Sequence, residues 1–229
     1  LDTPDDEHER LFRTNYFGVV HGCRAAVPRL HRGGAIVTVA SIAGQMGTPL
    51  MGAYGASKHA VIGYVETLRM ELGEAGRPIA VALVKPSGID TPIADHAANH
   101  AGGRARVPPP VYDPQLVADA ILDCAQHERR EVIVGGAGRA QTLFAAHFPP
   151  LFEKLAPKAA AAFVDPTDAQ PGPDNLFAPA RTGHVRSGHQ AGRRISLYTA
   201  ATRHRGASVL AVGAIAGGLT WLAARRRRQ

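Results

Sequence analysis

The sequence contains little cysteine: Cys23 and Cys124 are the only two in 229 residues. Two thiols so far apart do not form the framework of bridges that stabilises small secreted domains, so both are expected to be packing residues in a reducing compartment. His184 and His189 have no cysteine or carboxylate partners at the spacing of metal ligands. No metal site is therefore expected.

The C-terminal part of the sequence also lacks acidic residues. Residues 175–229 carry ten arginines and no Asp or Glu, whereas residues 1–174 carry 16 basic and 19 acidic side chains. The net charge of +7 therefore comes from the tail. These arginines flank an apolar stretch and are not interleaved with aromatic residues, a pattern that favours anionic lipid as a partner and argues against nucleic acid.

That apolar stretch covers residues 207–224, with Arg203 and Arg205 before it and residues 225–228, all arginine, after it. As a helix it would be about 27 Å long, slightly shorter than a hydrocarbon core of roughly 30 Å. Its six alanines and three glycines make it weakly hydrophobic, so a hairpin or a surface helix is the alternative. We expect a membrane-associating helix that either spans the bilayer or lies on it.

The rest of the sequence has the composition of a globular protein, with 45% apolar residues overall. It predicts a body over residues 1–163, a linker rich in Pro, Gly, His and Arg over 164–206, the apolar helix over 207–224, and a basic C-terminus, 225–229. Within the body, helices are expected at 4–30, 54–73, 114–127 and about 139–163, and strands at 35–40, 79–85 and 131–135. This alternation predicts a parallel α/β sheet with right-handed crossovers.

The most informative motif is Tyr54-Gly55-Ala56-Ser57-Lys58, with Ser41 thirteen residues before the tyrosine. If Tyr54 opens a helix, the i, i+4 spacing stacks its phenol and the Lys58 ammonium on one helical face, and Ser41 meets them from the end of the preceding strand. A cation about 4 Å away supplies roughly the 4 kcal/mol that would bring a phenol pKa from about 10 to about 7. The spacing suits proton transfer, although Tyr-x-x-x-Lys also arises by chance on half-exposed helices. The Gly-x-Ser-x-Gly elbow of a serine hydrolase is absent around Ser41 and Ser87.

Two further segments complete a pattern around this motif. Asn15 lies 26 residues before Ser41, and the predicted strand 79–85 runs directly into Pro86-Ser87-Gly88-Ile89-Asp90-Thr91-Pro92. With these residues in this order, residues 1 to about 140 resemble the short-chain dehydrogenase/reductase family, whose Asn, Ser, Tyr and Lys tetrad falls on Asn15, Ser41, Tyr54 and Lys58. The resemblance implies that Tyr54 is the acid/base, that Ser41 holds the substrate oxygen, and that Lys58 lowers the Tyr54 pKa while binding the nicotinamide ribose. It also implies that Asn15 positions a water linking Lys58 to solvent.

The same resemblance implies a nicotinamide cofactor and does not distinguish NAD from NADP. The cofactor-binding residues that it implies are Tyr54, Lys58, Pro86, Ser87, Gly88, Ile89 and Thr91, with the last two against the carboxamide. Ser87 stands where the family usually has glycine. No Gly-rich phosphate-binding turn precedes Asn15, so the expected fold is a Rossmann-like doubly wound parallel sheet that lacks its N-terminal phosphate-binding half and carries a C-terminal tail helix.

We therefore expect an NAD(P)-dependent oxidoreductase acting on a carbonyl or secondary alcohol, with a lipophilic substrate suggested by the tail. The expected partners are this small molecule and membrane lipid, and the expected location is a cytoplasmic catalytic domain attached to a membrane. Residues 93–111 correspond to the family's substrate lid, with a plain flexible loop as the alternative. Long helices at 4–30 and 54–73 are compatible with a homo-oligomer. The alternative function is a non-catalytic, membrane-anchored binding protein or a truncated inactive remnant.

Overall fold

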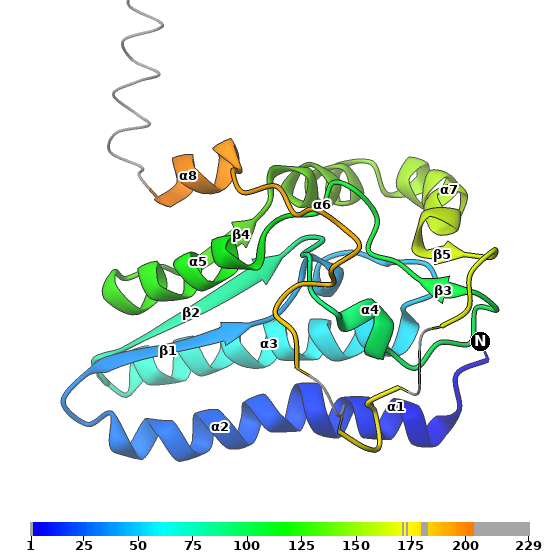
Figure 1. Ribbon diagram of the computed structural model, residues 1–229. Helices are drawn as coiled ribbons and strands as arrows, with labels where there is room; N and C mark the ends of the chain where they lie inside the picture. Colours follow the sequence, from blue (N-terminus) through cyan, green and yellow to red (C-terminus); the bar gives the residue numbers. More distant parts are fainter. Residues whose placement is uncertain (1, 171, 173, 180–182, 204–229) are drawn as a thin grey trace, which may run out of the picture.

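A three-stranded parallel sheet forms the centre of the molecule in the computed structural model, which describes residues 2–170, 172, 174–179 and 183–203 (Figure 1). The strands are β1 (Gly34–Val39), β2 (Ile79–Pro86) and β4 (Glu131–Val134), in the order β1-β2-β4. Both neighbouring pairs are parallel, with Gly34 opposite Ile79 and Leu83 opposite Glu131. The predicted parallel α/β architecture is confirmed, and each predicted strand lies within a residue of its observed position.

Helices cover both faces of this sheet (Figure 1). One face carries the N-terminal helical run and the long helix α3 (Gly52–Glu74), and the other carries α5 (Pro114–Gln126). The N-terminal run comprises α1 (Asp5–Phe12), the π-helical turn η1 (Arg13–Phe17), α2 (Gly18–Ala26) and the 3-10 turn η2 (Val27–Arg29). A single helix over 4–30 was expected, and the difference is the wider π turn in its middle, which re-aims the side chains there.

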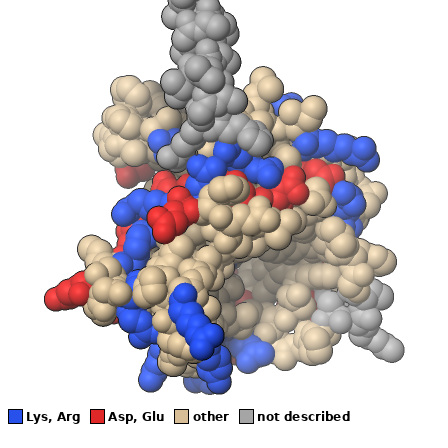
Figure 2. Space-filling model, turned by 90° about the vertical axis from the view of Figure 1, so that its left-hand side faces the viewer, with Lys and Arg blue, Asp and Glu red and all other residues tan. Residues whose placement is uncertain are grey.

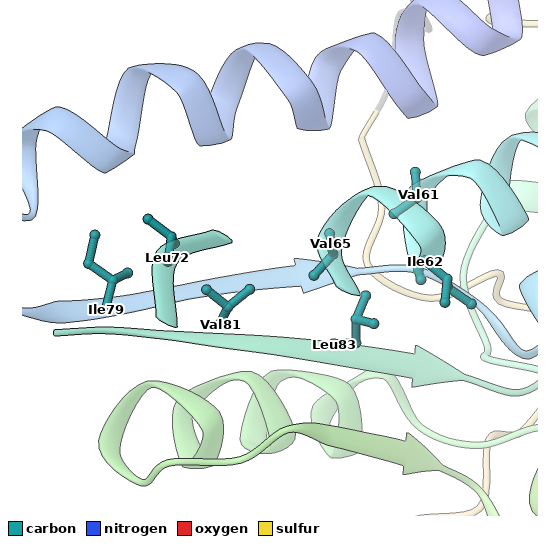
Figure 3. Close-up of a cluster of buried hydrophobic side chains, with 8 residues drawn as sticks. Val61, Ile62, Val65, Leu72, Ile79, Val81 and Leu83 are labelled. Carbon is teal, nitrogen blue, oxygen red and sulfur yellow. The ribbon is translucent and has the colours of Figure 1, made fainter. Parts of the chain in front are cut away.

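The two layers of the core follow from the alternation of side chains along β2. Val81 and Leu83 point to the α3 side, where they pack with Val61, Ile62, Val65, Leu72 and Ile79 (Figure 3). Ala82 and Val84, one residue out of phase, pack on the opposite side with α5. A strand buried on both faces needs a continuous apolar run, which is what the sequence of β2 provides.

The remaining elements surround the carboxyl end of the sheet. After β2 come α4 (Ile93–His96) and β3 (Arg104–Ala105), both within the segment expected to be a loop. After β4 come α6 (Gly136–His147), α7 (Pro149–Ala159), the 3-10 turn η4 (Ala160–Phe163), β5 (Val164–Asp165) and α8 (Leu197–Arg203). The continuous helical segment expected over 139–163 is divided at Phe148, after which Pro149 and Pro150 open a new helix.

The segment expected to be a linker, residues 164–206, packs on the body in its described part. β5 pairs antiparallel with β3, and the Arg193 amide donates to the Val111 carbonyl at 2.9 Å. Hydrogen bonds and ion pairs hold this segment on the body. Such polar contacts require no periodic apolar residues, so the sequence pattern did not indicate them. The predicted apolar helix, 207–224, and the basic C-terminus, 225–229, lie outside the described residues. No helix within the described ranges has both the length and the apolar character needed to cross a membrane.

Charges of both signs are mixed on the face shown in Figure 2. Lysine and arginine side chains lie next to aspartate and glutamate side chains in a band across the upper part of this view, and mainly basic side chains lie below it.

Candidate active site

Ser41, Tyr54 and Lys58 meet at the carboxyl end of β1. Ser41 follows the strand and caps the 3-10 turn η3 (Ile42–Gly44), its hydroxyl accepting from the Ala43 amide at 3.1 Å. Tyr54 and Lys58 lie in the first two turns of α3, and the Lys58 ammonium is 5.6 Å from the centre of the Tyr54 ring. The predicted stacking of these two side chains on one helical face is therefore present in the structure.

The electrostatics of this pair differ from the expectation. Burial raises the Tyr54 pKa above its usual value, and a hydrogen bond with the Ser41 side chain lowers it by less. Burial also lowers the pKa of Lys58, whose ammonium donates to the Val39 carbonyl at 3.3 Å. The predicted decrease of the Tyr54 pKa by Lys58 is thus not found, because a half-buried site disfavours both charged forms.

Asn15 approaches the site through a residue that sequence reasoning missed. The Asn15 amide, in the π-helical turn η1, donates to the Ser57 hydroxyl at 3.0 Å. Ser57 is fully buried, and its hydroxyl donates in turn to the Tyr54 carbonyl at 2.7 Å. Asn15 therefore fixes the first turn of α3 from the neighbouring helix. The spacing of three residues between Tyr54 and Ser57 in one helix could have indicated the hydrogen bond between these two residues.

The turn after β2, residues 86–91, lies at the carboxyl end of the central strand, where open α/β sheets bind ligands. Within it, the Ser87 hydroxyl donates to the Val134 carbonyl of β4 at 2.7 Å. Ile89 packs into the core on the α5 side. A Cβ at Gly88 would be 3.0 Å from Val107 and 3.2 Å from the Pro108 carbonyl oxygen. Ser87 is thus hydrogen-bonded to β4, and Ile89 is packed in the core. The close neighbours of Gly88 require a residue without a side chain at that position.

A second glycine-rich turn, Gly135-Gly136-Ala137-Gly138, follows β4 and opens α6. Such a turn can bind phosphate when its amides are free. Here the Gly135 amide donates to the Thr199 hydroxyl at 3.0 Å and the Ala137 amide to the Tyr112 hydroxyl at 3.3 Å. A side chain at Gly135 would collide with Ser87 and Tyr112. These glycines therefore allow close packing against the turn at 86–91.

Asp90 connects this same turn to the C-terminal part of the chain. Its side chain is 2% exposed and accepts from the Ser187 hydroxyl at 2.5 Å and the Ser187 amide at 3.1 Å. A third, longer hydrogen bond comes from the Gly192 amide at 3.4 Å. Residues 186–193, which we call the strap, thereby hold the turn from outside. A second carboxyl group also takes part, since Asp113 pairs with Arg186 of the strap at 2.9 Å.

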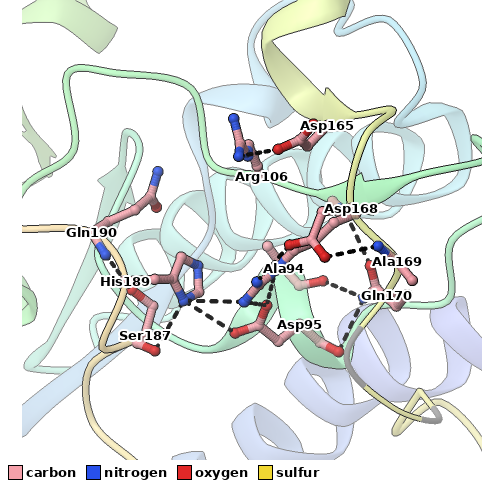
Figure 4. Close-up of polar contacts among 12 residues, drawn as sticks. Ala94, Asp95, Arg106, Asp165, Asp168, Ala169, Gln170, Ser187, His189 and Gln190 are labelled. Carbon is pink, nitrogen blue, oxygen red and sulfur yellow. Dashed lines mark hydrogen bonds and ion pairs between the residues drawn. The ribbon is translucent and has the colours of Figure 1, made fainter.

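The expected lid, residues 93–111, is tied to the chain beyond residue 163 by polar contacts (Figure 4). Arg104 lies 3.1 Å from Asp95 and 3.0 Å from Asp168, and Arg106 pairs with Asp165. The Arg104 ion pairs raise the pKa of its guanidinium. His189 of the strap also contacts Asp95, at 3.7 Å. A plain flexible loop therefore does not describe this segment.

The residues present fit one half of a nicotinamide cofactor. Tyr54 and Lys58 offer a phenol and an ammonium group at the carboxyl end of β1, and the neighbouring strand β2 leads into residues 86–91. The glycine-rich turn that follows β4 already donates its Gly135 and Ala137 amides to protein hydroxyls. The two buried cysteines are unpaired, and the described residues bring together no group of three or more His, Cys, Asp or Glu side chains that could hold a metal.

Comparison with known proteins finds similar chains and a similar fold. Residues 1–101 match the short chain dehydrogenase family. The whole chain is 33% identical to an uncharacterized oxidoreductase of Bacillus subtilis, YxnA, and spans 65% of its length. It is 31% identical to a zebrafish protein, dehydrogenase/reductase SDR family member 7B, over 63% of this chain and 48% of that one. A Burkholderia cenocepacia short chain dehydrogenase, solved in complex with NADP, superposes with a TM-score of 0.57 at 29% identity, covering 68% of this chain and 62% of that one.

Proposed function

We propose that this chain, whose residues 1–101 match the short chain dehydrogenase family and whose fold is similar to that of a short chain dehydrogenase, belongs to this family and performs proton transfer in an NAD- or NADP-dependent oxidoreductase. The substrate would be a carbonyl compound or a secondary alcohol. The observation that carries the proposal is the Tyr54 phenol, hydrogen-bonded with Ser41 and stacked under the Lys58 ammonium. A half-buried phenol beside a cation and a hydroxyl is suited to exchanging a proton with a substrate oxygen.

Each side chain has a distinct part in this proposal. Tyr54 gives its proton to the substrate oxygen or takes one from it, while the Ser41 hydroxyl holds the same oxygen. Lys58 uses one of its three N–H donors on the Val39 carbonyl, so two remain for the hydroxyls of a nicotinamide ribose. Asn15 acts through Ser57 as a positioning residue for α3. When bound, the nicotinamide would supply or accept the hydride, with residues 86–91 beside it.

We infer that Tyr54 rests in the protonated form, which is the proton donor in carbonyl reduction. Burial raises the pKa of Tyr54, so the phenol remains protonated at neutral pH and can donate. A base would need the deprotonated form, which burial disfavours.

The test of this function is Tyr54→Phe in the full-length protein, with Tyr64→Phe on the same helix as the matched control. Removal of the phenol hydroxyl should lower kcat for carbonyl reduction by roughly 10²- to 10⁴-fold with folding unchanged. The Tyr64 variant should retain activity, because that ring packs against Tyr16 away from Ser41. Substantial turnover by the Tyr54 variant would refute Tyr54 as the proton donor. Absence of turnover in the wild type and in both variants would instead favour a non-catalytic binding protein, the alternative function.

We propose membrane association for the apolar stretch 207–224 on its sequence alone, since it carries flanking arginines on both sides. Sedimentation with vesicles containing anionic lipid tests this. Binding should be lost when residues 207–229 are deleted and should weaken with added salt. Equal binding by the deleted protein would exclude a role for the tail.

A further inference from the structure

One side of helix α7 presents both apolar and basic side chains to solvent. Four residues share this side because their spacing follows the helical period, and we call them the α7 face: Leu151, Lys154, Leu155 and Lys158. The two leucines are 47% and 42% exposed, and both lysines are exposed. Phe148, which directly precedes the helix, is exposed as well. Large apolar side chains gathered on one exposed surface are typical of a site that contacts an apolar partner.

The other sides of α7 differ from this face. Phe152 is half-buried and packs edge to face on Phe144 of α6, with ring centres 6.1 Å apart. Glu153, the acidic residue of the helix, lies roughly opposite the α7 face around the helix axis. The ammonium groups of the two lysines form no hydrogen bond or ion pair with a residue that the structure describes. Within the described chain, the α7 face is therefore positively charged and uncovered.

The α7 face belongs to the same edge of the molecule as the end of α8. In Figure 1, α8, α6 and α7 follow one another along the upper edge, with α6 in the middle. The start of α6 packs against α8, since a Cβ at Gly136 would be 3.1 Å from that of Tyr198. α6 has 12 residues and so separates its two neighbours by roughly 18 Å. The apolar stretch begins at residue 207, at most about 14 Å of extended chain beyond Arg203, the last residue of α8.

The charges decide what can cover the α7 face. Residues 175–229 carry ten arginines and no acidic residue, so the tail would bring like charges to the two lysines if it folded back onto them. A second copy of the same face would repeat the same repulsion. A bilayer with anionic lipid fits both features, because its headgroups attract lysine and the boundary with the acyl chains accepts leucine and phenylalanine.

We propose that the α7 face lies on a membrane surface that contains anionic lipid, with Leu151 and Leu155 at the boundary of the acyl chains and Lys154 and Lys158 at the headgroups. The inference builds on the membrane association proposed for residues 207–224 and adds a second contact at the far end of α6. Two contacts on one edge fix the orientation of the folded body on the bilayer, whereas the tail alone leaves the body free to turn.

The first test removes the apolar contact from the full-length protein with Leu151→Ser and Leu155→Ser together. Met70→Ser with Leu122→Ser is the matched control, because these side chains are equally exposed on α3 and α5. Binding to vesicles of phosphatidylcholine and phosphatidylglycerol in equal parts should weaken roughly tenfold or more in the α7 variant and stay near wild type in the control. Equal binding by the two variants would overturn the proposal.

The second test removes the charge with Lys154→Gln and Lys158→Gln together. Binding of the full-length protein to the same anionic vesicles should weaken by roughly tenfold, because each lysine near an anionic surface contributes to the attraction. Binding to vesicles of phosphatidylcholine alone should not change. An equal loss on both kinds of vesicle, or no loss on either, would refute the contact with headgroups.

Two fluorescence signals separate the α7 face from the tail in the full-length protein. A polarity-sensitive fluorophore on Leu151→Cys reports the face, with Met70→Cys as the control; the two native cysteines are buried and leave the introduced thiol as the labelling site. Trp221, the single tryptophan of the sequence, reports the tail. Added vesicles should shift the emission of the fluorophore at position 151 to the blue, and spin-labelled lipid should quench it, with no change at position 70.

The combination of the two signals identifies which proposal fails. If Trp221 responds to vesicles and the fluorophore at position 151 does not, the tail binds lipid and the α7 face is refuted. If only the fluorophore responds, the face binds lipid and the proposal for the tail fails. A blue-shifted fluorophore before any vesicle is added would place the tail or a second copy on the face and overturn the inference; a dependence of the shift on protein concentration would identify the second copy.

Discussion

Replacement of Asp90 should detach the strap from the candidate cofactor turn. The Asp90 side chain is 2% exposed and accepts two short hydrogen bonds from Ser187, at 2.5 and 3.1 Å, and a longer one from Gly192. In Asp90→Ala these donors lose their acceptor inside the protein. In Asp90→Asn the side chain keeps its volume and one acceptor oxygen.

The magnitude follows from the number of hydrogen bonds and the burial. Hydrogen bonds to a charged group contribute about 1.5–3 kcal/mol each, and the cost of burying the charge offsets part of this. We expect Asp90→Ala to lower the free energy of unfolding by about 3 kcal/mol and Asp90→Asn by about 1 kcal/mol. Asp168→Asn is the control: its side chain is 50% exposed in its ion pair with Arg104, and exposed pairs contribute about 0–1 kcal/mol.

Urea denaturation at pH 7 measures the free energies, and hydrogen exchange locates the change. The Ser187 and Gly192 amides should exchange faster in Asp90→Ala, while amides of β2 should change only through global stability. A loss below about 1 kcal/mol in Asp90→Ala, or unchanged protection of the Ser187 amide, would refute the role assigned to these hydrogen bonds.

Three further predictions concern the core, the glycine-rich turn and pH. Glu131→Gln should lower the free energy of unfolding, measured by urea denaturation, by about 2–3 kcal/mol. The reason is that Lys85, which is 1% exposed and 2.7 Å from Glu131, loses its ionic partner. A loss no larger than that of an exposed ion pair would contradict this prediction. Gly138→Ala should cost about 1–3 kcal/mol, since its Cβ would lie 2.5 Å from that of Ser87. Gly63→Ala, with open space around it, should instead raise the melting temperature. The kcat/KM of carbonyl reduction should be constant through neutral pH and should fall only above pH 10. The reason is that the Tyr54 pKa is raised from 10.0 and that the protonated phenol is the donor. The kcat/KM of alcohol oxidation should rise over the same pH range.

The sheet and its helices could be predicted from the sequence because their signals are local. The apolar run of β2 and the helical periodicity of α3 each report burial directly, and both elements were expected within two residues of their observed ends. The stacking of Tyr54 and Lys58 was predictable for the same reason, since spacing along one helix determines it.

The contacts that complete the site could not be predicted because they join segments distant in the chain. Nothing near Asp90 indicates that Ser187 will face it, and the strap has a composition typical of linkers. The direction of the Tyr54 pKa shift was wrong for a related reason. A cation four residues away is visible in the sequence, whereas the burial that raises the Tyr54 pKa depends on the packing of the whole site.

The strap also determines when the site can be completed during synthesis. Asp90 and Ser187 are 97 residues apart, and Asp90 and Gly192 are 102 apart. At elongation rates of about 5–20 residues per second, the turn after β2 leaves the ribosome several seconds before the residues that hold it. The sheet has its three described strands by Val134. A nascent chain can therefore assemble its core first, and the candidate cofactor turn acquires its final support only when residues near position 192 have emerged.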